Sequence, residues 1–254
     1  MGNWNTFGRQ QEILAALSAK KVLAVSEMAR DFNVSEVTIR SDLDTLSKRG
    51  QLVRTHGGAV LPEDTANSRF FSSTINENRD IKTALANEAA AMVHDGDTVI
   101  IDSGSTMAIL ASLLHRKKIT VLTNSLPAVS ELASDEGIEL MVIGGSFRRS
   151  VLAAVGDFSS EMLRSINADI LFMGCTSFDS SRGISCPNLN EKITKRLMID
   201  ASRKVCVVAD CSKSNRTSLY QVASWKEIDC FITDSISDSD RKKLEASSVK
   251  VICT

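Results

Sequence analysis

The sequence predicts an α/β protein of two domains. A winged helix-turn-helix is expected over residues 1–61 and a mostly parallel α/β domain over residues 79–254, with a linker at residues 62–78. The chain has 254 residues, of which 43% are hydrophobic, which is enough for two separate cores. Residues 1–61 contain helical patterns followed by a hairpin pattern, whereas helical patterns alternate with apolar runs beyond residue 79. The linker is polar and lacks clear periodicity.

Two helices are expected before residue 33. Ile13 and Leu17 belong to an apolar stripe at helical spacing, which predicts the first helix. Ser26 is a suitable N-cap for a second, short helix that buries Met28.

The third helix has clearer boundaries. Ser35 is a suitable N-cap, and Val34 and Ile39 have the spacing of a hydrophobic staple around it. Gly50 suits the left-handed position that ends a helix. A hairpin pattern follows, in which residues 52–56 and 59–61 flank a Gly57-Gly58 turn, and this predicts the wing.

The second domain is expected to contain a mostly parallel sheet covered on both faces, because strand-length apolar runs alternate with helical patterns. The apolar runs lie at residues 98–101, 119–122, 140–143, 170–173, 205–209, 230–233 and 249–252.

A short polar loop follows the first of these runs. Residues 102–106 read Asp-Ser-Gly-Ser-Thr and lead into a helix that is expected to begin near Met107. Backbone N–H groups and the positive end of the helix dipole would point at one spot in such a loop, which suits a phosphate group. The alternative is a plain turn between strand and helix, with Thr106 as the helix cap.

Other strand ends carry small and polar residues that would meet the same loop, because ligands of parallel sheets bind outside the carboxyl ends of the strands. Thr123, Asn124, Ser125, Gly145, Arg148, Asp210 and Lys213 stand at such positions. Glu191 and Lys195 are spaced i and i+4 on a predicted helix. They are either a surface ion pair or two more groups beside the crevice.

Composition excludes some classes of protein. The net charge is −1, and residues 1–58 carry a surplus of only two positive charges, so charge alone does not indicate nucleic-acid binding. The six cysteines include no C-x-x-C pair, and the three histidines show no metal-ligand spacing. We therefore expect buried free thiols, no metal and no cofactor. Without a secretory signal or an apolar run of transmembrane length, a cytoplasmic protein with no membrane partner is expected.

Residues 34–43 (VSEVTIRSDL), together with Leu46, Gly50, Leu52, Arg54 and residues 56–59, resemble the DNA-reading signature of the DeoR family of bacterial repressors. The resemblance continues through residues 102–106, 123–125 and 144–145, Gly156, Gly174, Asp179, Gly183, Glu191, Lys195, Arg196, Asp210, Ser212 and Lys213. It implies a sensor domain related in fold to ribose-5-phosphate isomerase, a phosphorylated sugar or sugar alcohol as effector, and a homo-oligomer, dimer or tetramer, on double-stranded operator DNA.

The chain departs from the family pattern at three places. Ser41 replaces a common Arg or Lys, residues 214–215 replace Phe-Gly, and residues 177–178 replace Gly-Ile ahead of Asp179. The last two departures lie beside the expected effector crevice. The candidate effector-binding residues are Asp102, Ser103, Gly104, Ser105, Thr106, Thr123, Asn124, Ser125, Gly145, Arg148, Asp179, Glu191, Lys195, Asp210 and Lys213.

The third helix is expected to enter the major groove with the face opposite its apolar side, and Arg40 is the best candidate for a guanine or phosphate contact. Arg54 and His56 in the wing would meet the DNA backbone or minor groove. The candidate DNA-binding residues are Ser35, Val37, Thr38, Arg40, Ser41, Thr45, Lys48, Arg49, Arg54 and His56.

The sequence therefore predicts a transcriptional repressor of a sugar or sugar-alcohol operon that a phosphorylated sugar releases from DNA. Two alternatives stay open. An isomerase-like enzyme could use Asp179, Glu191 and Lys213 as acid and base, although the DNA-reading domain favours sensing over turnover. An architectural DNA-binding module without an effector is the other alternative.

Overall fold

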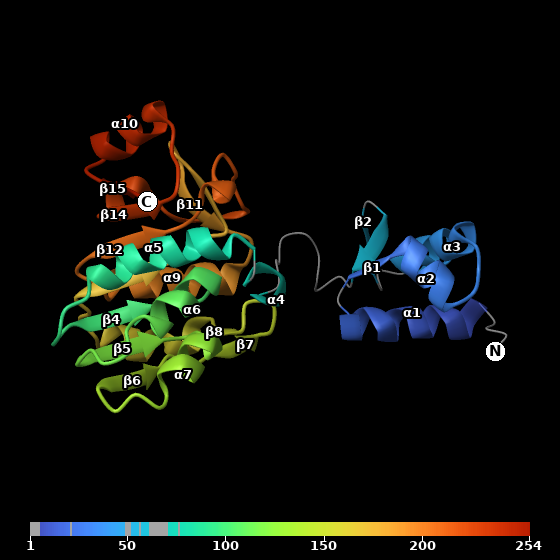
Figure 1. Ribbon diagram of the computed structural model, residues 1–254, viewed down its shortest axis with the longest axis horizontal. Helices are drawn as coiled ribbons and strands as arrows, with labels where there is room; N and C mark the ends of the chain where they lie inside the picture. Colours follow the sequence, from blue (N-terminus) through green and yellow to red (C-terminus); the bar gives the residue numbers. More distant parts are fainter. Residues whose placement is uncertain (1–5, 21, 49–51, 56, 61–70, 76) are drawn as a thin grey trace. The chain divides into compact units, whose positions relative to one another are not determined.

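The computed structural model describes residues 6–20, 22–48, 52–55, 57–60, 71–75 and 77–254. The chain divides into two units, residues 1–69 and 70–254 (Figure 1). Each unit has hydrophobic core residues of its own. The second unit includes a short helix, α4 (Phe71–Thr74), in a stretch that the sequence pattern assigns to the linker. Phe71 is buried, so the packed part of the second unit begins before residue 79.

The first unit is a winged helix-turn-helix, as predicted. Its elements are α1 (Thr6–Lys20), β1 (Val22–Ala24), α2 (Val25–Asp31), α3 (Glu36–Lys48), β2 (Val53–Thr55) and β3 (Gly58–Val60). The strands form an antiparallel sheet in the order β1-β3-β2, and β1 was not expected from the sequence. Gly58 is required where β1 and β3 meet, because a Cβ atom there would lie 2.2 Å from the Leu23 carbonyl oxygen.

Two predicted helix caps have different outcomes. Ser35 caps α3 as expected, since its Oγ accepts a hydrogen bond of 3.1 Å from the Thr38 N–H. Ser26 does not cap α2, which begins at Val25 with Ala24 as N-cap. The reason is that β1 runs directly into α2, and the Val25 N–H is already bonded to the Gly57 carbonyl oxygen. Asp42 joins α3 to α1, because its buried carboxylate accepts from Arg9 and Gln10.

The second unit is built on a seven-stranded parallel sheet in the order β15-β14-β12-β9-β4-β5-β6. Each predicted apolar run lies on one of these strands, with shifts of one or two residues at the ends. The strands are β4 (Thr98–Ile101), β5 (Ile119–Thr123), β6 (Ile138–Val142), β9 (Ile170–Met173), β12 (Val205–Val208), β14 (Cys230–Thr233) and β15 (Lys250–Cys253). The chain adds β5 and β6 on one side of β4 and the later strands on the other, so the topological switch point lies between β4 and β9.

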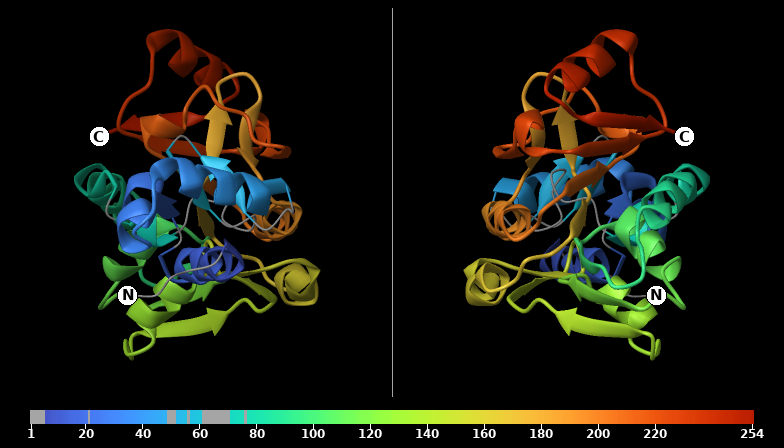
Figure 2. Two further views of the ribbon diagram at one scale, coloured as in Figure 1. Left: turned by 90° about the vertical axis from the view of Figure 1, so that its right-hand side faces the viewer. Right: turned by 90° about the vertical axis from the view of Figure 1, so that its left-hand side faces the viewer.

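Helices cover both faces of this sheet. Alternate residues of β4 divide between the two cores: Ile100 packs in one and Val99 and Ile101 in the other. The face of Val99 is covered by α5 (Arg79–Ala91), α6 (Ser105–Ser112) and α7 (Leu126–Leu132) (Figure 1). The opposite face is covered by α8 (Ser160–Arg164), α9 (Leu189–Asp200) and α10 (Asp238–Ala246). α10 lies beside β15 at one end of the sheet, and β6 forms the other end (Figure 2).

Several short elements between the parallel strands were not predicted. The hairpin of β7 (Ser146–Arg148) and β8 (Ala153–Val155) follows β6. A three-stranded antiparallel sheet contains β10 (Ser177–Asp179), β11 (Gly183–Cys186) and β13 (Tyr220–Ala223). The single-turn helices are η2 (Asp157–Ser159), η3 (Cys211–Lys213) and η4 (Trp225–Glu227). Within the described residues, no helix is long and apolar enough to cross a membrane.

Candidate functional site

The outward face of α3 carries the predicted DNA-reading residues. Val37 is 72% exposed, and Arg40 and Ser41 are exposed beside it. Ile39 on the opposite side is fully buried, so α3 presents this polar face to solvent. An exposed helix face behind a short helix and ahead of a wing is the arrangement that enters a major groove.

Several of the predicted contacts are engaged within the first unit. The Arg40 guanidinium pairs with Glu36 one turn earlier, at 2.7 Å. Arg54 reaches from β2 to α3, where it donates to the Asp44 carboxylate and to the Arg40 carbonyl oxygen. Arg54 therefore fastens the wing to α3. Thr38 bonds Ser35, and the Thr45 hydroxyl donates to the Ser41 carbonyl oxygen. Arg49, His56 and the side chain of Lys48 lie outside the described residues.

In the second unit, the residues at the switch point form a buried ionic centre. The Lys195 ammonium donates from α9 to the Asp102 carboxylate at the end of β4 and, at 2.8 Å, to the Gly174 carbonyl oxygen after β9. Both charged side chains are at least nine-tenths buried. Burial disfavours the charged lysine, but the Asp102 carboxylate outweighs it and raises the pKa of Lys195 above its ordinary value.

A second ion pair lies one turn earlier on α9. Arg148 Nε at the end of β7 is 2.7 Å from Glu191 Oε1, and the Glu191 side chain is only 8% exposed. Burial raises the pKa of Glu191, although the positive charges of Lys195 and Arg148 oppose the change. Glu191 and Lys195 are thus buried at the switch point with separate partners. The reading of the two as a surface pair is wrong, because i,i+4 spacing does not reveal which face of a helix is buried.

The N-terminus of α6 faces the same switch point. α6 begins at Ser105 with Gly104 as N-cap in the left-handed region, so Thr106 is not the cap and the helix starts before Met107. Ser105 and Thr106 are each 9% exposed, and neither hydroxyl has a hydrogen-bond partner among the described residues. Together with Ser103, this loop follows Asp102 directly and offers unpaired donors beside the Asp102–Lys195 pair.

The loop after β5 is held mainly by its own hydrogen bonds. The Thr123 hydroxyl accepts from the Ser125 N–H, and the Ser125 hydroxyl caps α7. Asn124 donates through Nδ2 to the Ala154 carbonyl oxygen, while its buried Oδ1 has no partner among the described residues. Of these three residues, Asn124 alone retains a free polar atom for a ligand.

Comparison with known proteins decides the family. The chain matches the model of the DeoR-like helix-turn-helix domain over residues 9–65 and the model of the DeoR C terminal sensor domain over residues 77–235. It belongs to the DeoR family of transcriptional regulators. It is 34% identical over 244 residues to the uncharacterized HTH-type transcriptional regulator YulB of Bacillus subtilis, covering 96% of this chain and 95% of that protein. It is 32% identical over 253 residues to a putative aga operon transcriptional repressor of Escherichia coli O157:H7, covering 97% and 93%.

Solved structures give weaker likenesses. Ribose 5-phosphate isomerase A from Methanocaldococcus jannaschii has a TM-score of 0.41 at 19% identity, covering 54% of this chain and 55% of that one. The eIF2B beta structure from Chaetomium thermophilum has a TM-score of 0.45 at 11% identity, covering 89% and 64%.

The remaining predicted sensor residues differ in how they relate to the crevice. Asp210 is buried after β12 and bonds Ser212, whereas Lys213 is half-buried and makes no ion pair within the described residues. Gly145 needs its small size, because a Cβ atom there would lie 2.8 Å from the Val155 carbonyl oxygen.

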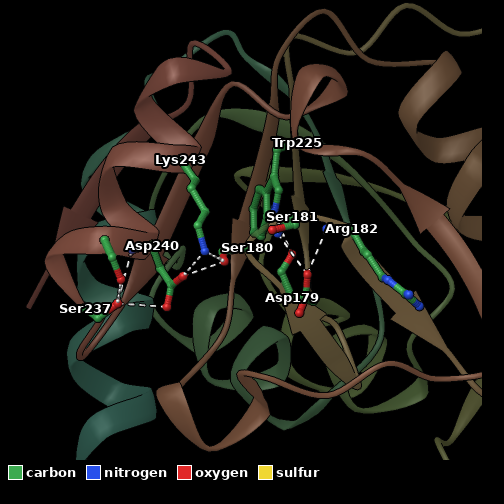
Figure 3. Close-up of polar contacts among 9 residues, drawn as sticks. Asp179, Ser180, Ser181, Arg182, Trp225, Ser237, Asp240 and Lys243 are labelled. Carbon is green, nitrogen blue, oxygen red and sulfur yellow. Dashed lines mark hydrogen bonds and ion pairs between the residues drawn. The ribbon is translucent and has the colours of Figure 1, made fainter.

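Asp179 lies in the turn between β10 and β11. Its carboxylate accepts from the Ser181 and Arg182 N–H groups at 2.9 Å, so it stabilises its own turn, and the Trp225 ring N–H donates to its carbonyl oxygen (Figure 3). These bonds give Asp179 a structural role in the turn between β10 and β11.

Two residues near the Asp102–Lys195 pair and α9 were not predicted. Cys175 directly follows Gly174, and burial raises the pKa of its thiol to about 12 in spite of the positive charges of Lys195 and Lys213. Thr194 of α9 accepts a hydrogen bond of 2.8 Å from the Gly156 N–H. The signal for Cys175 was its place at a strand end, whereas Thr194 has no signal in the sequence because its role depends on where α9 packs.

Proposed function

We propose that this DeoR-family regulator represses an operon for sugar or sugar-alcohol catabolism and is released from operator DNA by a phosphorylated sugar. One observation carries the proposal. At the switch point, the N-terminus of α6 presents two hydroxyl groups without partners, from residues that are each only 9% exposed, next to the buried Asp102–Lys195 pair. Unpaired donors at a helix N-terminus suit a phosphate group.

The crevice also offers groups for the rest of a sugar. The free Asn124 Oδ1 and the carboxylates of Asp102 and Glu191 can accept hydrogen bonds from sugar hydroxyls. Lys213, beyond Asp210, supplies a positive charge that no carboxylate in the described chain neutralises. A small ligand with a phosphate at one end and hydroxyls along its length fits this set.

Repression follows from the reading face of α3. One reading head of this size contacts a single half-site, so we propose a homo-oligomer, at least a dimer, that places two heads on repeated half-sites of double-stranded DNA in the cytoplasm. The effector releases the operator by binding more tightly to the state in which the heads do not match the half-sites. The relative from Escherichia coli O157:H7 is described as a putative transcriptional repressor, which supports repression rather than activation.

The experiment combines two measurements on the full chain. The melting temperature is measured with glucose 6-phosphate, fructose 6-phosphate, fructose 1-phosphate, ribose 5-phosphate and glycerol 3-phosphate. Release of an operator, selected from random DNA with the same protein, is then titrated with each compound, and product formation is followed to detect turnover. A rise in melting temperature together with release and no product supports the proposal. Release by none of these compounds, or turnover, contradicts it.

Variants of the phosphate site sharpen the test. Thr106→Val and Lys213→Ala each remove one polar group, and a hydrogen bond to a charged group contributes about 1.5–3 kcal/mol. We expect both variants to bind operator like the wild type but to need roughly tenfold or more extra effector for release, as measured by fluorescence anisotropy. Lys226→Ala, at an exposed site on η4, is the matched control. Wild-type release by both crevice variants would place the effector elsewhere.

A further inference from the structure

The β7–β8 hairpin connects the crevice with the start of the second unit. Arg148, the last residue of β7, pairs with Glu191 in the crevice at 2.7 Å. Two residues later, the Ser150 carbonyl oxygen accepts a hydrogen bond of 2.8 Å from the Phe71 N–H. Phe71 is the first described residue after the DNA-reading unit in the chain. The loop that begins after β7 therefore links two things: the Arg148 side chain, which pairs with Glu191, and the Phe71 N–H, which marks the start of the second unit.

Both ends of α4 are fastened to the second unit. Phe71 is 9% exposed and bonds Ser150, which is itself buried. At the other end, the Thr74 carbonyl oxygen accepts from the ammonium group of Lys82, a residue of α5 that is 3% exposed. Lys82 is fixed by the packing of α5, so a shift of the Ser150 loop acts on the Phe71 end of α4.

The hairpin also contacts the other loops of the crevice. The Ala154 N–H donates to the Asn124 carbonyl oxygen, and Asn124 Nδ2 donates back to the Ala154 carbonyl oxygen. The Leu126 N–H donates to the Leu152 carbonyl oxygen, and Gly156 donates to Thr194 of α9. Leu152 is in the left-handed region at φ 48°, a conformation that a branched residue keeps only where its surroundings hold it. Contacts on several sides thus set the conformation of this loop.

We propose that the β7–β8 hairpin transmits effector binding to the DNA-reading unit, with Arg148 as the sensing side chain and the Ser150–Phe71 hydrogen bond as the output. This inference rests on the proposed function. A phosphate in the crevice competes with Glu191 for Arg148, because both are anions and a guanidinium binds either one. When Arg148 turns to the ligand, the loop that follows it moves and the Phe71 anchor weakens. The effector site and the DNA-reading unit are then coupled through the β7–β8 hairpin, which has one arrangement with the ligand and another without it.

The first test needs no effector. Amide hydrogen exchange of the peptide that contains Phe71 is compared in the full chain for wild type, Arg148→Gln and Arg149→Gln. Arg149 is the matched control, because it is an exposed arginine in the same loop. We expect Arg148→Gln to speed exchange of the Phe71 amide about tenfold or more and Arg149→Gln to leave it unchanged. Equal exchange in the two variants overturns the proposal.

The second test removes the output bond and leaves the crevice intact. Phe71→Pro deletes the N–H donor at the first position of α4, where proline is tolerated, and Phe71→Ala keeps the donor while removing the same ring. The probe is whichever of the five phosphates named above releases wild type. We expect both variants still to bind it, and Phe71→Pro alone to bind operator about tenfold more weakly before it is added, because the bond that the effector weakens is already absent.

The outcomes separate the two proposals. Wild-type operator affinity of Phe71→Pro in the absence of effector overturns the coupling while the effector assignment stands. If none of the five phosphates releases wild type, the proposed function fails, and the exchange comparison still decides whether Arg148 controls the Phe71 anchor. Circular dichroism identifies a Phe71→Pro protein that has not folded, and the exchange comparison then decides the question.

Discussion

Charged side chains in this regulator differ in how firmly they are held. The Lys195 and Asp102 side chains are buried, and removing one partner of such a pair leaves an uncompensated charge in the protein interior. The Arg40 and Glu36 side chains are 53% and 46% exposed, and ion pairs of this kind contribute only about 0.3–0.5 kcal/mol. Arg40 can therefore leave Glu36 and contact DNA at a small cost in free energy. The buried Asp102–Lys195 pair is expected to keep its geometry unless a ligand takes over its hydrogen bonds.

This contrast predicts opposite effects for two neighbouring substitutions on α3. Arg40→Ala should weaken specific operator binding by about 1–3 kcal/mol, the range for a bidentate base contact. Glu36→Gln frees Arg40 and should strengthen binding by up to about 0.5 kcal/mol. Fluorescence anisotropy with labelled operator at one salt concentration measures both. Unchanged affinity in Arg40→Ala would remove that residue from the reading face.

At the scale of elements, the β10–β11 hairpin is fastened to the start of α10 by polar contacts. Asp240 accepts from the hydroxyl groups of Ser180 and Ser237, and Lys243 donates to both Asp240 and Ser180 (Figure 3). The Ser180 hydroxyl, followed by Lys243 and Ser237, lowers the pKa of Asp240 from 3.8 to about 2. The hairpin tip and α10 therefore share one carboxylate that must be ionised.

The sign of the pH effect follows from this lowered pKa. A carboxyl group whose pKa is lower in the folded than in the unfolded chain stabilises the fold at pH values above its unfolded pKa. The contribution of Asp240 is therefore complete above about pH 4 and is lost as the pH falls toward about 2. We expect Ser180→Ala to return the pKa of Asp240 toward 3.8, as measured by NMR titration of the side-chain carboxyl. An unchanged titration in that variant would show that the hairpin does not contribute to the shift.

How far the sequence could predict these elements depends on how local their signals are. The start of α3 was predictable because Ser35 and Ile39 lie within one turn of it. The seven parallel strands were predictable because each contains an apolar run of strand length, although only the five inner strands are largely buried. The strand β1 was not, because it forms only by pairing with the distant β3, and the β7–β8 and β10–β11 hairpins were not, because strands of three or four residues leave little pattern in the sequence. The same holds for the site: strand ends indicated Asp102 and Asn124, but Lys195 joined Asp102 only once α9 was packed.

At the scale of the whole molecule, two units with separate cores match the helix-turn-helix and sensor domains of the family. Among the described residues, the core of the first unit runs from Ile13 to Ala59, and the two cores of the second begin at Leu85 and Ile100. Domains with their own cores can change their relative orientation without unfolding. Release of DNA by an effector requires such a change. The Phe71 anchor lies where the chain enters the second unit, so it can bias that relation without touching either core.

The salt dependence of operator binding tests whether two heads act together. Arg40, Lys48, Arg49 and Arg54 are the cations that can neutralise phosphates, and Arg54 is partly committed to Asp44. With about three cations engaged per head, a dimer neutralises about six phosphates, so the slope of log affinity against log salt should lie near −5. Residues 1–69 alone, binding as a monomer, should give roughly half that slope. Titrations between about 50 and 200 mM salt measure both.

Equal slopes for the full chain and the fragment would mean that one head binds at a time, and slopes near zero would contradict the assignment of α3 as a DNA-reading helix.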